Sequence, residues 1–197
     1  MQVGVKMVQK RNLSEAKVVT AAAKLVDEQG GDALSFSRVA AELAVKPQAL
    51  YAYFSSKETL KVAVIVHFLD GITAAISQAL IGISGERALE EYGHMLRRLL
   101  LAQPEHARLA FGGINYRHQE VAIHHLQQLI DILEALIQPY TSTTTMTRHR
   151  ARLFRAMVFG FVQNELWGLF QYGEILADES FEYGLQRLIN QLTTIEK

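Results

Sequence analysis

Residues 35–57 read SFSRVAAELAVKPQALYAYFSSK and contain two short helical patterns that are separated by only three residues. Ser35 is a good N-cap for a helix over residues 36–43, because its hydroxyl can accept a hydrogen bond from an amide of the first turn. Pro47 suits the first position of a second helix over residues 47–53, where no backbone N–H is needed. Two short helices joined by so short a turn indicate a helix-turn-helix.

The second of these helices has one buried face and one outward face. Leu50 and Phe54 are four residues apart, so they can be buried together. The outward side chains are small, amide-bearing or aromatic, and they suit the major groove of DNA, where a glutamine can pair with adenine through two hydrogen bonds. The outward residues are Lys46, Gln48, Ala49, Tyr51 and Ala52, with Tyr53 at the edge.

This region closely resembles the tetracycline-repressor (TetR) family of transcriptional regulators. The resemblance implies that Tyr51 and Lys57 bind phosphates and that Ser35 anchors the DNA backbone. It also implies that the segment of Lys46, Pro47, Gln48 and Ala49, together with Ala52, faces the bases. The matching residues are Val18, Val19, Ala21, Ala22, Leu25, Gly30, Ser35, Val39, Ala40, Leu50, Tyr51, Tyr53, Phe54, Lys57, Glu58 and Leu60, with looser matches at 104–111, 160–167 and 181–192.

Three residues depart from the pattern of that family. Ala44 stands where glycine is usual, and a left-handed alanine would cost about 1 kcal/mol. Lys46 replaces a serine or threonine cap, which loses a cap but adds a charge that attracts phosphate. Arg38 replaces an acidic residue near a helix start, which slightly disfavours the helix but suits DNA. We therefore include Arg38 and Lys46 among the predicted DNA contacts.

The rest of the 197-residue chain also reads as helical, because apolar residues recur at spacings of three and four almost throughout. We predict an all-α fold with a three-helix head at residues 1–56 and a helical ligand-sensing and dimerisation body at 57–197. The boundary falls inside the long fourth helix rather than in a loop. The nine expected helices are about 14–29, 36–43, 47–53, 56–82, 87–102, 104–111, 119–138, 148–172 and 180–194, with a polar loop at 141–147.

The net charge of zero hides a difference between the two parts. Residues 1–57 carry eight lysines and arginines against five acidic residues, whereas the remainder carries twelve against fifteen. A basic head fits a polyanionic partner at one end of the molecule. The apolar stretch 62–83 is interrupted by polar side chains, so we expect a buried helix and no membrane contact. No signal-peptide pattern is seen in residues 1–13, and we expect a cytoplasmic protein.

Other polar clusters have structural explanations. The chain has no cysteine, so disulfides and thiolate metal sites are excluded. No two histidines lie four residues apart in the group of His118, Glu120, His124 and His125, so we expect no metal site and no cofactor. Ser14 should cap the first helix, and Ser55 with Glu58 should form a capping box. The arginines at 148, 150, 152 and 155 read as the solvated start of a helix, and no motif supports an enzyme.

The last two helices are the predicted dimer surface. The last helix repeats apolar residues in a narrow stripe that suits a helix–helix seam. The helix before it carries more apolar surface than one side of a monomer needs, although burial within the monomer is the alternative. In the resembled family these two helices form a four-helix bundle with their copies. The predicted interface residues are Leu153, Met157, Gly160, Phe181, Leu185, Leu188 and Leu192.

A ligand pocket should lie between the fourth and eighth helices, because a sensing body needs a cavity with an apolar lining and a few polar anchors. His67 and Asp70 are polar residues on an otherwise apolar helix, and a solvent-facing or paired structural role is their alternative interpretation. We expect an apolar or aromatic ligand. The predicted ligand residues are His67, Asp70, Tyr92, Met95, Leu99, Phe111, Tyr116, Phe161, Asn164 and Trp167, with Val66 and Leu126 nearby.

The resemblance to the TetR family implies a dimeric transcriptional repressor that leaves a palindromic operator when a small molecule binds its body. The change would be a population shift that alters the spacing of the two heads. Two alternatives are a helical ligand-binding or adaptor protein without DNA binding, and an enzyme that uses His67 and Asp70. Salt-dependent retention on duplex DNA would distinguish the repressor from a ligand-binding or adaptor protein without DNA binding. Catalytic turnover that survives deletion of the head would indicate the enzyme.

Overall fold

The computed structural model describes residues 13–171 and 174–194, and within these ranges it contains helices and no strand, which confirms the all-α prediction. Four single-turn or two-turn 3₁₀ helices connect the longer α-helices. The α-helices are α1 (Glu15–Gln29), α2 (Phe36–Glu42), α3 (Lys57–Ala79), α4 (Gly85–Ala102), α5 (Pro104–Gly112), α6 (Glu120–Ile137), α7 (Thr144–Leu166) and α8 (Ala177–Thr193). The 3₁₀ helices are η1 (Gly31–Ala33), η2 (Pro47–Ala52), η3 (Tyr116–His118) and η4 (Gln138–Tyr140).

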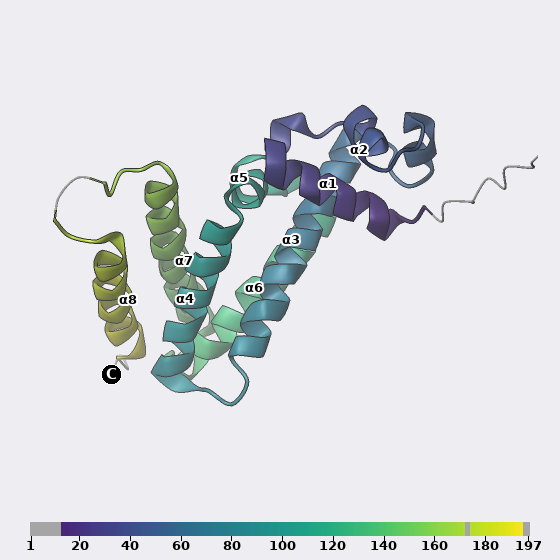
Figure 1. Ribbon diagram of the computed structural model, residues 1–197. Helices are drawn as coiled ribbons and strands as arrows, with labels where there is room; N and C mark the ends of the chain where they lie inside the picture. The colour runs from purple at the N-terminus through teal and green to yellow at the C-terminus, as the bar shows by residue number, and fades with distance from the viewer. Residues whose placement is uncertain (1–12, 172–173, 195–197) are drawn as a thin grey trace, which may run out of the picture.

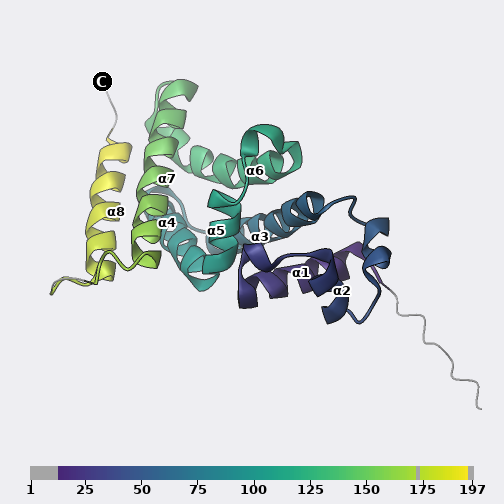
Figure 2. The ribbon, with the colours of Figure 1, turned by 90° about the horizontal axis from the view of Figure 1, so that it is seen from above.

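The helices form a small head and a longer body that share α3. Figure 1 shows α1 and α2 at one end of the molecule and α3 running from them along the body beside α6. Figure 2 shows α7 and α8 side by side at the opposite edge. The head and the outer pair of helices are therefore separated by the layer that contains α3, α4 and α6.

The head is organised by caps and by a compact apolar core. Ser14 caps α1 as predicted, since its side chain accepts from the Lys17 amide at 3.3 Å. Gly30 ends α1 with φ of 79°, and its N–H donates to the Val26 carbonyl at 2.8 Å. Only glycine adopts such a conformation without strain. The fully buried residues of the head include Val18, Ala22, Val26, Leu34, Val39 and Leu50.

Helix α3 is the main core helix of the described chain. By length and composition it could cross a membrane, a property that it shares with core helices of globular proteins. It packs against α1, α4, α5 and α6. The helix begins one residue later than predicted, because Ser56 and Thr59 form the capping box instead of Ser55 and Glu58. Ser55 has the usual acidic partner of a capping box three residues on, whereas Ser56 has a threonine there, so only the backbone geometry identifies Ser56 as the cap.

The predicted dimer stripe of α8 is buried inside the protomer, which corrects the prediction. The residues Phe181, Leu185, Leu188 and Leu192 are all less than 9% exposed and pack where α8 meets α4 and α7. A methyl group at Gly93 of α4 would lie 2.8 Å from Leu185 Cδ1, so α8 approaches α4 closely. A narrow apolar stripe is suited to any helix partner, and here the partner is the rest of the same chain.

The prediction that the arginines at 148, 150, 152 and 155 are all solvated is wrong for Arg150. Its side chain is 7% exposed, and its guanidinium donates to the carbonyls of Tyr140 and Leu192 and, at 3.2 Å, to that of Thr194. These acceptors lie in η4, which follows α6, and at the end of α8. Arg150 therefore fastens both chain segments to α7, which begins at Thr144, inside the predicted polar loop.

Candidate nucleic-acid interface

The turn between α2 and η2 is a Schellman motif. The Val45 N–H donates to the Ala40 carbonyl at 2.9 Å, and the Ala44 N–H donates to the Ala41 carbonyl at 3.0 Å. Ala44 directly follows the C-cap residue of α2 and has a φ of 51°. This value confirms the left-handed conformation that was considered from the sequence. This motif usually takes glycine at that position. The turn is thus tight and well hydrogen-bonded but slightly strained.

The second helix of the motif is the 3₁₀ helix η2 and not an α-helix. Pro47 occupies its first turn, and the Lys46 side chain makes no capping hydrogen bond, as expected for a lysine at an N-cap. Leu50 is fully buried and Phe54 is 5% exposed, so the inward face is as predicted. These two anchors fix η2 on the core of the head.

The outward face of η2 is accessible. The side chains of Lys46, Gln48, Tyr51 and Ala52 are exposed, and Pro47 and Ala49 are partly buried. Tyr51 is 61% exposed, yet its ring packs edge-on against Phe36 of α2 with 4.6 Å between ring centroids. An aromatic pair of this kind restrains the ring. The face therefore presents a pre-positioned tyrosine beside a glutamine, a lysine and small side chains.

Tyr53 does not share this free surface. It is partly buried, and its hydroxyl donates to the Leu13 carbonyl at 2.7 Å. The residue thus ties η2 to the chain just before α1. Tyr53 therefore helps to hold the head together, and its contact with DNA stays a prediction. The hydrogen bond spans 40 residues of sequence and could not be inferred from local pattern.

Two helix starts complete the surface. Ser35 caps α2 by accepting from the Arg38 amide at 3.4 Å, and the Arg38 guanidinium donates to Gln29 Oε1 at 2.8 Å. Lys57 is exposed in the first turn of α3, whose N-terminal N–H groups favour an anion. Ser35, Arg38 and Lys57 therefore lie at helix starts, where a phosphate would be held electrostatically.

The head contacts the body through α5 as well as through α3. His106 of α5 is 3% exposed, and its Nδ1 lies 2.7 Å from Asp27 Oδ1 of α1, an ion-pair distance without the alignment of a hydrogen bond. The His106 ring also stacks on Phe68 of α3, with 5.5 Å between ring centroids. A side chain from the body thus sits between the first helix of the head and the helix that joins both parts.

Comparison with known families agrees with this architecture. Residues 18–64 match the family model of bacterial regulatory proteins of the tetR family, and residues 89–188, just over half of the chain, match the tetracyclin repressor-like C-terminal domain. The chain belongs to the TetR family. It is therefore a DNA-binding transcriptional regulator of the helix-turn-helix type.

Individual relatives cover most of this TetR-family chain. An uncharacterized HTH-type transcriptional regulator, YobS of Bacillus subtilis (strain 168), is 19% identical over 170 residues, 86% of this chain and 82% of that protein. The crystal structure of BioQ with its natural double-stranded DNA operator is 26% identical, with a TM-score of 0.65 over 92% of this chain and 98% of that one. A TetR variant from Acinetobacter baumannii AYE in complex with minocycline is 24% identical, with a TM-score of 0.66 over 91% and 96%.

The predicted ligand residues of this regulator lie in several places within the described chain. Tyr92 is fully buried, its hydroxyl donates to the Leu129 carbonyl at 3.0 Å, and burial raises the pKa of its phenol. Met95 is buried beside it on α4. Trp167 is 65% exposed. Leu99, Phe111 and Phe161 are partly buried in the apolar packing, with Phe111 against Phe159, and Asn164 donates to the Gly160 carbonyl.

Tyr116 differs from the other predicted ligand residues. It lies in η3, between α5 and α6, and its hydroxyl is buried without a hydrogen-bond partner among the described residues. Burial raises its pKa to about 12. A buried hydroxyl without a partner is costly, and such a group calls for a specific explanation. Tyr116 is therefore a polar group of the body that could receive an additional partner, as is Arg155, whose Nε is also buried without a hydrogen-bond partner among the described residues.

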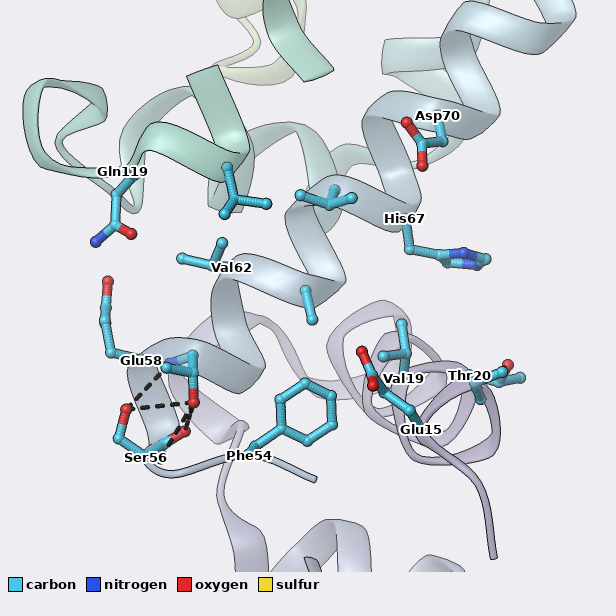
Figure 3. A pocket seen from close by; sticks show the side chains of 15 residues that line it. Glu15, Val19, Thr20, Phe54, Ser56, Glu58, Val62, His67, Asp70 and Gln119 are labelled. Carbon is cyan, nitrogen blue, oxygen red and sulfur yellow. Dashed lines mark hydrogen bonds between the residues drawn. The ribbon is translucent and has the colours of Figure 1, made fainter. Parts of the chain in front are cut away.

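His67 and Asp70 lie on the outer face of α3, because the neighbouring Phe68 and Leu69 face the core. They line a groove that includes α1 of the head, an element that the sequence analysis left out (Figure 3). Asp70 does not pair with His67; its Oδ1 lies 2.6 Å from Nδ1 of His125 on α6. Within the described residues no group of three metal-binding side chains is found.

The exposed faces of α7 and α8 carry the remaining dimer candidates. Leu153 is 47% exposed, and Gly160, two turns further along α7, is exposed with no atom near the position of a Cβ. Met157 is partly buried. On α8, Tyr183 is 66% exposed, and Arg187 lies over its ring at 5.4 Å. A helix face with an exposed apolar residue and an open glycine permits close approach of another helix.

Proposed function

We propose that this regulator is a dimeric repressor that binds a palindromic operator in the cytoplasm and releases it when a small apolar or aromatic molecule binds. The observation that carries the proposal is the outward face of η2. It presents Gln48 and Tyr51 as exposed side chains, on a helix that two buried residues hold in place. We propose no catalytic role.

In the proposed complex the side chains divide into two groups. Gln48, Ala49 and Ala52 face base edges, where the glutamine amide can both donate and accept. Tyr51 and Lys57 contact phosphates, which position the head without reading sequence. The BioQ structure with its operator supports this arrangement, since that protein shares the fold over nearly its whole length. In this proposal the head ends at residue 56, directly before Lys57 and the start of α3 that would bind a phosphate.

Dimerisation would use the outward faces of α7 and α8. A two-fold axis beside these helices gives an isologous interface, so each protomer would contribute Leu153, Gly160 and Tyr183. The two heads would then lie at corresponding ends of the assembly. Two symmetric heads read two half-sites, which is why a palindrome is expected.

The ligand response would involve the interior of the body. The unpartnered Tyr116 hydroxyl supports a polar contact there, next to the largely apolar packing of the body. The minocycline complex of a fold relative supports small-molecule binding in this class of body. Because α5 contacts α1 through His106 and Asp27, a shift near the α5–α6 connection can reach the head.

Selection of bound sequences from random duplexes tests this function directly. We expect a palindromic consensus and a dimer by light scattering at micromolar concentration. Leu153→Glu should separate the dimer and abolish operator binding, because it places two like charges at the interface. Ile81→Glu is the matched control, since Ile81 is a 71% exposed apolar residue outside the proposed interface and should leave both properties unchanged. A monomeric wild-type chain, or a consensus without symmetry, would contradict the proposal.

A further inference from the structure

An open groove lies where the head meets the body. It encloses about 920 Å³ and is lined by α1, the segment before α3, one face of α3 and the start of α6. A volume of this size is within the range of small-molecule sites. Figure 3 shows the groove with α1 on one side and α3 on the other. Head and body thus both contribute walls.

The floor and one edge of the groove are apolar. Val19 of α1, the Phe54 ring and Val62 of α3 line the groove (Figure 3), and Val66 of α3 also belongs to the lining. Val121 on α6 is 60% exposed at the edge. Apolar side chains left open to water in a concave surface gain free energy when an apolar molecule covers them.

The charged side chains of the lining all have the same sign. Glu15, Glu58 and Asp70 line the groove, and its lining includes no lysine or arginine. Figure 3 shows these carboxylates around the apolar centre. Glu58 is paired with Lys61 at 2.9 Å and Asp70 with His125 at 2.6 Å, whereas Glu15, in the first turn of α1, makes no ion pair among the described residues. Negative charge around an apolar floor is complementary to an apolar cation.

We propose that this groove between α1, α3 and α6 binds a small apolar cation. This groove is separate from the interior of the body near Tyr116, and only its effect on the operator rests on the proposed DNA-binding function. A ligand held here contacts Glu15 of the head and Asp70 of the body at once. Its binding would therefore restrict how the head sits on the body, and this restriction couples the groove to operator affinity.

A pair of probes with the same shape and opposite charge tests the charge preference. We use tetraphenylphosphonium and tetraphenylborate, titrated into the full chain by calorimetry. The cation should bind once per chain, and it should bind more weakly as salt is raised, because the carboxylates are exposed. The anion should bind at least tenfold more weakly. Equal binding of the two ions would overturn the proposal, as would no binding of the cation.

Single substitutions locate the site. Glu15→Gln and Asp70→Asn should each weaken binding of the cation about twofold to fivefold, as expected for exposed ion pairs. Glu179→Gln is the matched control: Glu179 is exposed, lies in the first turn of α8 as Glu15 does in α1, and is far from the groove lining. Unchanged binding in the Glu15→Gln and Asp70→Asn double variant would contradict the assignment.

Substitutions at Val121 test the sign of the charge at one position. Because Val121 is exposed, Val121→Lys and Val121→Glu should both fold, which melting by circular dichroism checks. Val121→Lys should reduce cation binding at least fivefold, and Val121→Glu should strengthen it about twofold. Changes in the same direction for both variants would show a purely steric effect and overturn the charge argument.

The basic N-terminal segment is the competing occupant, because it carries Lys6, Lys10 and Arg11. Changing all three to glutamine should leave cation binding unchanged. Tighter binding in that variant would mean that the chain's own segment fills the groove, and it would overturn the proposal. All titrations use the chain without DNA. Failure of the operator selection therefore leaves this test intact, and a failed titration leaves the DNA-binding proposal intact.

Discussion

The head and the body keep their polar side chains in different places. The buried core of the head is apolar, and its candidate functional groups, such as Gln48 and Lys57, lie on the surface. The three buried polar or charged residues of the described chain, His106, Thr147 and Arg150, all belong to the body. A partly buried pair also joins α4 and α7 there, because Arg97 and Glu165 form two hydrogen bonds of 2.7 Å.

This difference separates two kinds of function. A surface group on a fixed scaffold can change its binding partner without changing the scaffold. Such an arrangement suits the recognition of DNA sequences. A buried polar group contributes to the conformation of its surroundings, because its hydrogen bonds cannot be replaced by water. Substitutions on the head should thus alter binding with little effect on stability, whereas substitutions of the buried groups should alter stability first.

The largest effect is expected for Arg150→Met. Loss of the guanidinium leaves the carbonyls of Tyr140, Leu192 and Thr194 without this donor, and we expect a loss of about 3 kcal/mol in the free energy of unfolding. Urea unfolding measures it. Arg148→Met is the control, since Arg148 is exposed on the same helix and should change stability by less than about 0.5 kcal/mol. Similar losses of stability in the two variants would contradict the structural role of the buried Arg150 guanidinium.

Gln48→Ala should have the next largest effect, and on binding alone. We expect the base preference to relax at one symmetric pair of operator positions, at about 1–3 kcal/mol per contact, while the melting temperature stays unchanged. Binding to a panel of operators with single base changes measures the preference. An equal loss of affinity for all sequences would instead place Gln48 at a phosphate.

Tyr116→Phe should stabilise the ligand-free chain by about 1 kcal/mol, since it removes a buried hydroxyl that has no hydrogen-bond partner. Thermal melting gives the change. Tyr92→Phe is the matched control and should destabilise, because that hydroxyl donates to Leu129. A destabilised Tyr116→Phe variant would show that the hydroxyl already has a partner, and it would weaken the case for a ligand there.

Ala44→Gly should give the smallest effect, a gain of about 0.5–1 kcal/mol. Relief of the left-handed conformation, worth about 1–2 kcal/mol, outweighs the extra chain entropy of glycine, which costs about 0.4–1 kcal/mol. Chemical unfolding measures the gain, and Ala41→Gly within α2 should destabilise by a similar amount. A loss of stability in Ala44→Gly would show that the left-handed conformation of Ala44 is not strained.

How far the structure follows from the sequence depends on the range of the interactions. Ser35, Pro47 and Leu50 give local signals, and the helix-turn-helix was correctly predicted from them. Contacts between distant segments were not predictable. The Tyr53 hydroxyl reaches Leu13, and Arg150 reaches the end of α8.

The dimer stripe and the groove show the same limit. The apolar stripe of α8 predicted a covered face correctly, but periodicity does not identify what covers it. His67 and Asp70 were found as polar residues on an apolar helix, whereas the contribution of α1 to the groove depends on how the head is packed. The family resemblance added residue roles on the head. Of the residues concerned, Ser35, Pro47 and Ala49 are partly buried, and the exposed ones are Lys46, Gln48, Tyr51, Ala52 and Lys57.

The central claim is that the head holds DNA through surface charges at helix starts. The most direct measurement is the salt dependence of operator binding for the wild-type chain, for Lys57→Ala and for the control Arg148→Ala, which removes the same charge from an exposed position on the body. The slope of log affinity against log salt should fall by about 1 per head in Lys57→Ala, because one phosphate contact is lost. It should stay at the wild-type value in Arg148→Ala. An unchanged slope in Lys57→Ala, or equal changes in both variants, would contradict the account.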